Sequence, residues 1–211
     1  MGGTQEEWLS DGLGASVARG TRWQVLAQQV VMGPTLLPKS APRWFAPSTQ
    51  LTPETQRELE QGVGLAAGGI PFGLDRWDGY PAARARLLAA AQRSRANLVT
   101  LSGDSHNAWA YDLVQDGLPA GVEFAGPAVS SLGIEKRFTG DPDRIASDFL
   151  STNPDLKWCD TSRRGYMVVE LTRDAARCDW LFLPSLGVRS TALLGSASFA
   201  TEKGANALQR S

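Results

Sequence analysis

The chain has 211 residues, 42% of them hydrophobic and 20% charged, which is enough apolar content for one globular domain with a core. The net charge of −1 argues against a nucleic-acid partner. No stretch approaches the ~18 apolar residues of a membrane span, and no apolar leader follows Met1, so we expect neither a transmembrane segment nor a signal peptide in these residues. Cys159 and Cys178 are too few for a disulfide framework or a zinc finger and are predicted to be reduced or buried thiols.

The first half of the chain predicts helix, strand and a long irregular stretch. Residues 5–19 have the apolar spacing of an amphipathic helix, and residues 22–32 form the apolar run of a strand that is mostly buried. Four prolines make residues 33–52 irregular. Thr52 and Pro53 have the form of a helix N-terminus, and this helix is predicted to end near Gln61.

The second half alternates helix and strand, which is the pattern of an α/β fold. A helix is predicted from Pro81 to about Arg95, followed at once by a buried strand at 97–102. Further elements are predicted as a hairpin of 107–114 with 120–125, a helix at 141–151 and a C-terminal β-hairpin of 165–172 with 178–184. Residues 195–211 are rich in Ser, Ala and Gly and are expected to be a poorly ordered tail, which leaves 1–194 as the domain.

The sharpest local signal runs from Leu101 to Asn107 and reads Leu-Ser-Gly-Asp-Ser-His-Asn. It follows a predicted buried strand, and ligands bind at the carboxyl ends of strands in open α/β sheets. Asp104 and His106 are two residues apart, so both side chains can reach one metal ion; carboxylate oxygen and imidazole nitrogen suit iron, zinc or manganese. The alternative is an Asp104 that caps a turn beside an ordinary polar His106.

Two weaker signals lie elsewhere in the chain. The block from Asp75 to Pro81 contains Trp77, Asp78 and Tyr80 just before a helix, where it could bind an anion or position a metal-bound water, or only cap the helix. Arg163 and Arg164 could clamp a phosphate, or be surface arginines on an edge strand.

Several mechanisms are disfavoured by what the sequence lacks. His106 is the single histidine, so these residues cannot form a multi-histidine metal cage. There is no Gly-x-Ser-x-Gly nucleophile motif and no Gly-x-x-x-x-Gly-Lys-Ser/Thr phosphate loop.

Five stretches occur in the order found in the second half of alkaline phosphatase D (PhoD-like) proteins, and together the chain resembles that family over most of residues 4–172. They are Gln5-Glu6-Glu7-Trp8-Leu9 with Trp23-Gln24-Val25-Leu26, Asp75-Arg76-Trp77-Asp78-Gly79-Tyr80-Pro81, the segment Leu101–Trp109, Glu123-Phe124 with Ser130-Ser131, and Asn153-Pro154 with Arg164-Gly165-Tyr166. Each motif is moderately specific, and their shared order is strong. One departure is Asp155, where the family often has a histidine after Asn-Pro.

The resemblance implies the second half of a calcineurin-like metallophosphatase sandwich that hydrolyses phosphate mono- or diesters. It implies iron and calcium as cofactors, Asp104 and His106 as metal ligands, and His106 as a catalytic residue as well. Arg163 and Arg164 would bind substrate, and Trp77, Asp78 and Tyr80 would lie near the site. The family's earlier metal-ligand blocks precede the region that this chain matches, and its members are exported to the periplasm or the outside of the cell.

Three functions remain open. The chain is a metallophosphoesterase that needs its missing N-terminal half, a non-catalytic remnant that docks onto a partner, or a phospholipase D-like diesterase of the same fold. If part of the sandwich is missing, the strands at 22–32 and 97–102 should lose cover. The exposure of Val25, Val30, Leu98 and Leu101 tests that expectation.

Overall fold

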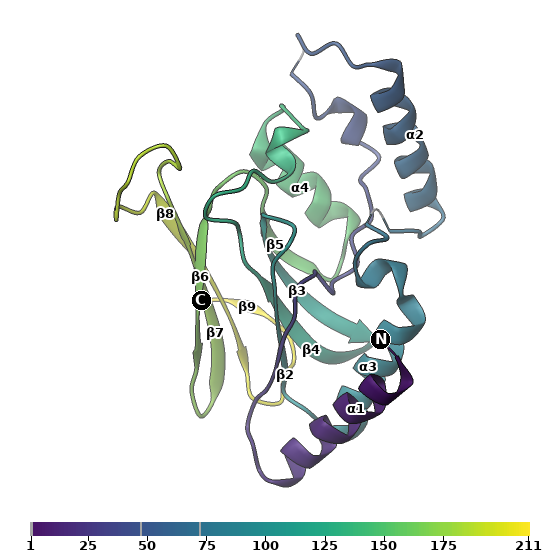
Figure 1. Ribbon diagram of the computed structural model, residues 1–211, viewed down its shortest axis with the longest axis vertical. Coiled ribbons are helices and arrows are strands. Elements are labelled where there is room, and N and C mark those ends of the chain that lie inside the picture. The colour runs from purple at the N-terminus through teal and green to yellow at the C-terminus, as the bar shows by residue number, and fades with distance from the viewer. Residues whose placement is uncertain (1, 47, 72) are drawn as a thin grey trace.

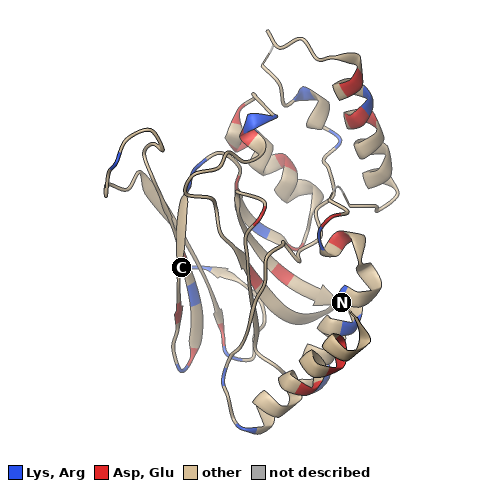
Figure 2. Ribbon diagram, viewed as in Figure 1, with Lys and Arg blue, Asp and Glu red and all other residues tan. Residues whose placement is uncertain are grey.

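The protein is built of three layers: helices, a five-stranded sheet and a four-stranded sheet (Figure 1). The computed structural model describes residues 2–46, 48–71 and 73–211. Within that part of the chain no helix is both long and apolar enough to cross a membrane. Positive and negative side chains are interspersed over the elements (Figure 2).

The five-stranded sheet has the strand order β1-β2-β4-β3-β5. Its members are β1 (Gln24–Ala27), β2 (Leu98–Ser102), β3 (Ala108–Gln115), β4 (Leu118–Ala125) and β5 (Leu156–Asp160). β1, β2 and β4 run parallel, whereas β3 is antiparallel to both β4 and β5. The predicted hairpin is confirmed: Asp116 and Gly117 both have positive φ (53° and 75°), as a two-residue turn requires.

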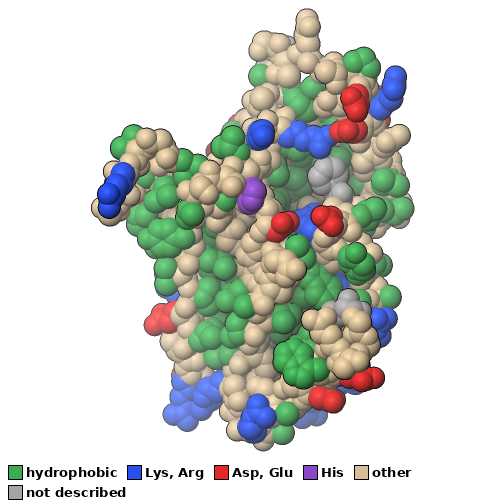
Figure 3. Space-filling model, in the orientation of Figure 1, with side chains coloured by type: hydrophobic (Ala, Val, Ile, Leu, Met, Phe, Trp, Pro, Cys, Tyr) green, Lys and Arg blue, Asp and Glu red, His purple; other side chains and the backbone are tan. Residues whose placement is uncertain are grey.

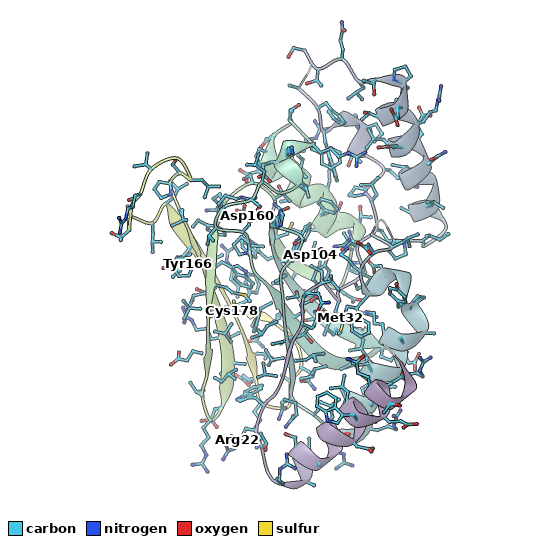
Figure 4. The ribbon with its side chains drawn as sticks, viewed as in Figure 1. Arg22, Met32, Asp104, Asp160, Tyr166 and Cys178 are labelled. Carbon is cyan, nitrogen blue, oxygen red and sulfur yellow. The ribbon has the colours of Figure 1, made fainter. Side chains whose placement is uncertain are left out.

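The four-stranded sheet consists of β6 (Gly165–Leu171), β7 (Ala175–Phe182), β8 (Gly195–Glu202) and β9 (Gln209–Arg210). Its inner face packs on the five-stranded sheet around Trp180, Phe182 and Phe199 on one side and Val99 and Phe124 on the other. The outer face is left open among the described residues, where Tyr166 and Val168 are exposed. Figure 4 shows Tyr166 on this side of the molecule.

Helices cover the other face of the five-stranded sheet. They are α1 (Gly3–Ala18), α3 (Pro81–Ser94) and α4 (Pro142–Thr152), while α2 (Pro53–Ala67) lies over the irregular segment that precedes it. Thr52 caps α2 through its side chain, which accepts a hydrogen bond from the backbone N–H of Thr55 at 3.2 Å. Leu88 of α3 and Phe149 of α4 are buried against the sheet. The helix–sheet order therefore follows the predicted α/β pattern.

Two expectations from the sequence are wrong. Residues 195–211 are not a loose tail: β8 alternates buried Ala197, Phe199 and Thr201 with outward side chains and completes the second sheet, so the predicted hairpin is the start of a larger sheet. The strand predicted at 22–32 is only β1, because the chain bends away after Ala27. β5 was not predicted at all.

The four residues chosen to test the loss of cover differ in exposure between β1 and β2. Val25 on β1 is 44% exposed, and Val30 is half-buried. On β2, Leu98 is buried and Leu101 is half-buried and packs on the inter-sheet core. The exposure of Val25 on β1 therefore agrees with the expectation, whereas the burial of Leu98 on β2, which has a hydrogen-bonded strand on each side, contradicts it.

Phe199→Ala tests whether β8 is part of the core. The ring is 5% exposed and contacts Trp158 and Trp180, so its removal should lower the free energy of unfolding by about 3–5 kcal/mol. Urea unfolding measures the change, with Ser196→Ala on the exposed face of the same strand as the control. A loss below about 1 kcal/mol for Phe199→Ala would mean that residues 195–202 do not stabilise the sandwich.

Candidate metal-ligand site at the carboxyl ends of three parallel strands

The loop that carries Asp104 and His106 lies where β1, β2 and β4 end together, as the sequence predicts. Backbone hydrogen bonds join the three ends: the N–H of Gly103 donates to Gln29 O at 3.1 Å, and that of Gly126 donates to Ser102 O at 2.8 Å. Gln29 follows β1 and Gly126 follows β4, so the loop after β2 is held from both sides. This is the edge of an open α/β sheet at which ligands bind.

The backbone of this loop is strained at both candidate ligands. Asp104 has φ 63° and His106 has φ 60°, values in the left-handed region that side chains other than glycine seldom adopt. Between them, Ser105 accepts a hydrogen bond from the indole N–H of Trp109 at 2.8 Å, which ties the loop to β3. Strain of this kind persists only where the surroundings impose it, and it is common at functional sites.

The two side chains are accessible. Asp104 is exposed and His106 is half-buried. His106, the single purple side chain of Figure 3, is visible on the same view in which Figure 4 marks Asp104. The imidazole Nδ1 lies 2.9 Å from Leu132 O, and Nε2 has no hydrogen-bond partner among the described residues.

The two arginines have protein partners. Arg163 forms a salt bridge with Asp160, and its guanidinium lies 4.0 Å from the centre of the Phe182 ring. Arg164 is buried, donates hydrogen bonds to the backbone oxygens of His106 and Ser131, and pairs with Glu135 at 3.0 Å. Its burial lowers the pKa of the guanidinium, and the carboxylate of Glu135 opposes that shift. Arg164 thus holds the loop of His106, and a role in substrate binding stays a prediction for both arginines.

A buried carboxylate lies beneath the strand ends, at a residue that belongs to the family resemblance but for which the sequence predicted no role. Glu123 on β4 is fully buried and accepts hydrogen bonds from Met32 N (2.8 Å), Gly33 N (2.7 Å) and Ser102 Oγ (2.7 Å). Burial raises its pKa, and these hydrogen bonds oppose the shift. The signal in the sequence was a charged residue inside the apolar run Gly121–Ala125.

The block with Trp77, Asp78 and Tyr80 supports the same segment from the helix side. The indole N–H of Trp77 donates to the side chain of Gln28 at 3.1 Å, and Asp78 accepts from Thr35 N at 3.3 Å. Asp78 is buried; desolvation raises the pKa of its carboxyl to about 6, although Arg76, 3.7 Å away, lowers it. Tyr80 is exposed. Trp77 and Asp78 therefore contact the chain that follows β1, and the three residues do not share a hydrogen-bond partner.

The donor chemistry of the loop fits a metal ion but supplies only part of a coordination shell. Asp104 offers carboxylate oxygens and His106 offers Nε2, a combination suited to iron. Within the described ranges, no group of three or more His, Cys, Asp or Glu side chains is placed to bind a metal. Both cysteines are free and buried, as predicted, and burial raises the pKa of their thiols.

These features define a layered α/β protein with a polar ligand loop at the end of its parallel strands. The family profile of the PhoD-like phosphatases matches residues 1–180, and the chain belongs to that family. It is 29% identical to alkaline phosphatase D of Bacillus subtilis (strain 168) over 216 residues, which cover all of this chain and 31% of that protein. A solved structure described as "Structure of PhoD" matches 99% of the chain at 25% identity with a TM-score of 0.69, over 34% of its own length. The chain thus spans about a third of these relatives.

Asp78→Asn tests the buried carboxyl beneath the site. Because the pKa of Asp78 is about 6 in the folded protein against 3.8 ordinarily, the folded state holds the proton more tightly, and stability falls as pH rises from about 4 to about 6. In the variant this fall should shrink by on the order of 1–2 kcal/mol, after allowance for solvent screening. Urea unfolding at pH 4, 5, 6 and 7 measures it.

The matched control is Asp75→Asn, which removes an exposed carboxylate from the same block. The raised pKa of Glu123 affects the unmodified protein and both variants alike, so its contribution to the pH dependence of stability cancels in the comparison. Equal pH profiles for Asp78→Asn and the unmodified protein would contradict the assignment.

Proposed function

We propose that this chain forms the second half of a calcineurin-like metallophosphatase fold that hydrolyses phosphate mono- or diesters. The observation that carries the proposal is the placement of Asp104 and His106 on one strained loop at the carboxyl ends of three parallel strands. Membership of the PhoD-like phosphatases and the face-to-face packing of two sheets support it. Assays that compare phosphate monoesters with diesters would test a phospholipase D-like preference for diesters.

The residues of this chain would have distinct roles in that reaction. Asp104 and His106 would bind the metal, with iron and calcium as the proposed ions, and His106 could instead hydrogen-bond the phosphate. A bound metal ion polarises a phosphoryl oxygen and provides a water-derived nucleophile at neutral pH. Arg163, whose side chain is 37% exposed, is the better candidate of the two arginines to stabilise charge. Export of the longer protein is a further inference from the resemblance alone.

The isolated 211-residue chain should not hydrolyse an aryl phosphodiester when iron and calcium are added. The reason is that the described residues supply two ligands and no group of three. Release of the aryl alcohol is followed by absorbance, with full-length alkaline phosphatase D of Bacillus subtilis as the positive control. Robust turnover by the chain alone would overturn the view that further ligands come from elsewhere.

The proposed ligands are tested in a chimera in which this chain replaces the matching third of the Bacillus subtilis protein. Asp104→Asn and His106→Ala should each reduce the activity of that chimera by at least ~100-fold, as expected when a metal ligand or its support is lost. Asp143→Asn, an exposed carboxylate of α4, is the control. An active chimera that keeps its rate after Asp104→Asn would contradict the metal assignment.

A second candidate is a docking fragment, and the free edge of β1 favours it. Gln24 donates its N–H to Asn97 O, just before β2, and Gln28 donates to Leu101 O on β2, both at 3.0 Å. The N–H groups of Val25 and Ala27 therefore point away from β2. No described strand pairs with that edge. A cavity of about 750 Å³ runs beside it, lined by exposed Trp8 and Tyr80 among others. Such edges pair readily with another strand.

Val25→Lys should reduce self-association of the isolated chain. A lysine on an edge strand disfavours strand pairing, whereas the apolar edge of the unmodified chain promotes it. Sedimentation velocity over a range of concentrations measures the average mass. Val168→Lys, on the exposed outer face of the second sheet, is the control for a general effect of charge. If the unmodified chain stays monomeric at every concentration, the edge does not pair with a second copy of the chain.

A further inference from the structure

We infer that the segment 131–135 is a positioning device that holds His106 in the tautomer with its proton on Nδ1, so that Nε2 keeps a free lone pair. Leu132 O lies 2.9 Å from Nδ1 of the imidazole. A carbonyl oxygen can only accept a hydrogen bond, so Nδ1 must carry the proton. In a neutral ring, Nε2 is then the acceptor, and the hydrogen bond of one ring nitrogen fixes what the other can do.

The segment that supplies this carbonyl is itself held by two polar side chains from outside it, Arg164 and Asn107. Arg164 donates to Ser131 O at 3.2 Å and to Glu135 at 3.0 Å, and the same guanidinium donates to the backbone oxygen of His106. The buried Asn107 accepts from Ile134 N at 3.0 Å. Both the imidazole-bearing residue and the segment opposite it are thereby attached to Arg164 and Asn107.

Gly133 shows how closely this segment approaches its support. A Cβ at that position would lie 2.3 Å from the amide oxygen of Asn107, closer than any real contact. Glycine is therefore required by packing at Gly133, and its N–H donates to Glu135 at 2.8 Å. A methyl group there must displace either the Asn107 side chain or the segment, and either movement disturbs the contact between Asn107 and Ile134 without touching His106 itself.

With the proton on Nδ1, the lone pair of Nε2 can bind a metal ion or accept a hydrogen bond. In the other tautomer Nε2 would carry the proton and could do neither. This inference deepens the proposed role of His106, but its test needs neither metal nor turnover. The proposed tautomer can therefore be disproved while the phosphatase proposal stands. The phosphatase proposal can equally be disproved while the tautomer is confirmed.

The test uses the untagged 211-residue chain, because His106 is its single histidine and both ring nitrogen signals then belong to that residue. Long-range proton–nitrogen NMR spectra of the histidine-¹⁵N-labelled protein are recorded at about pH 9, above the usual pKa of histidine. We expect a protonated Nδ1 and an unprotonated Nε2. A protonated Nε2 in the unmodified chain would overturn the inference.

Arg164→Lys and Gly133→Ala should each move the two nitrogen signals toward those of free imidazole with exchanging tautomers. Arg163→Lys, at the neighbouring position, should leave them unchanged, because Arg163 contacts Asp160 and Phe182 instead. Backbone amide spectra establish that each variant is folded. Folded Arg164→Lys and Gly133→Ala proteins with unshifted ring signals would show that the segment 131–135 does not control the tautomer.

Discussion

The Glu123 carboxylate has no access to water, and this constraint fixes the end of the sheet at which the candidate ligands lie. A buried carboxylate is costly unless its oxygens are satisfied, and two backbone N–H groups and one hydroxyl satisfy them here. The N–H donors belong to Met32 and Gly33, so the chain beyond β1 must reach the Glu123 side chain of β4. The hydroxyl belongs to Ser102, the last residue of β2. One side chain thus joins the exits of three strands.

The loop of Asp104 and His106 is held between this anchor and a second one. On one side it begins at Ser102, and on the other Arg164 and Asn107 hold His106 and the segment opposite. Two left-handed residues in three positions cost energy of order 1–3 kcal/mol each, so such a loop would relax if either anchor were absent. The strain and the buried polar contacts are two parts of one arrangement.

The parts of the fold that were predictable are those with local signals. Pro81 marks the start of α3, and Asp116-Gly117 marks a turn whose φ values only such residues adopt easily. β5 and β8 lacked such signals. β5 pairs with β3, which is far away in sequence. The small residues of β8 resemble those of a disordered tail, and their alternation around Phe199 indicates a strand only once the opposite sheet is known.

The candidate site divides in the same way. The position of Asp104 and His106 at the end of β2 was predictable, because both follow one apolar strand on a glycine-started loop, while their role as metal ligands stays a prediction. The partners of Arg164 were not, because they lie at 131–135 and at His106, and no local pattern links those positions. Two adjacent arginines look alike in sequence, and only the tertiary structure separates the buried Arg164 from the partly exposed Arg163.

The edge of β1 that no described strand pairs with lies beside the candidate ligand loop. Gln29 O, just beyond β1, accepts the N–H of Gly103 at 3.1 Å, so the exit of β1 lies beside the ligand loop. Strands in a sheet are about 4.8 Å apart, and a strand added outside β1 would lie roughly 10 Å from β2. If it ran parallel to β1, its carboxyl end would reach the same edge of the sheet as Asp104. A segment docked there is therefore placed to bring further ligands toward the loop, which would couple the pairing of that edge to the assembly of a metal site.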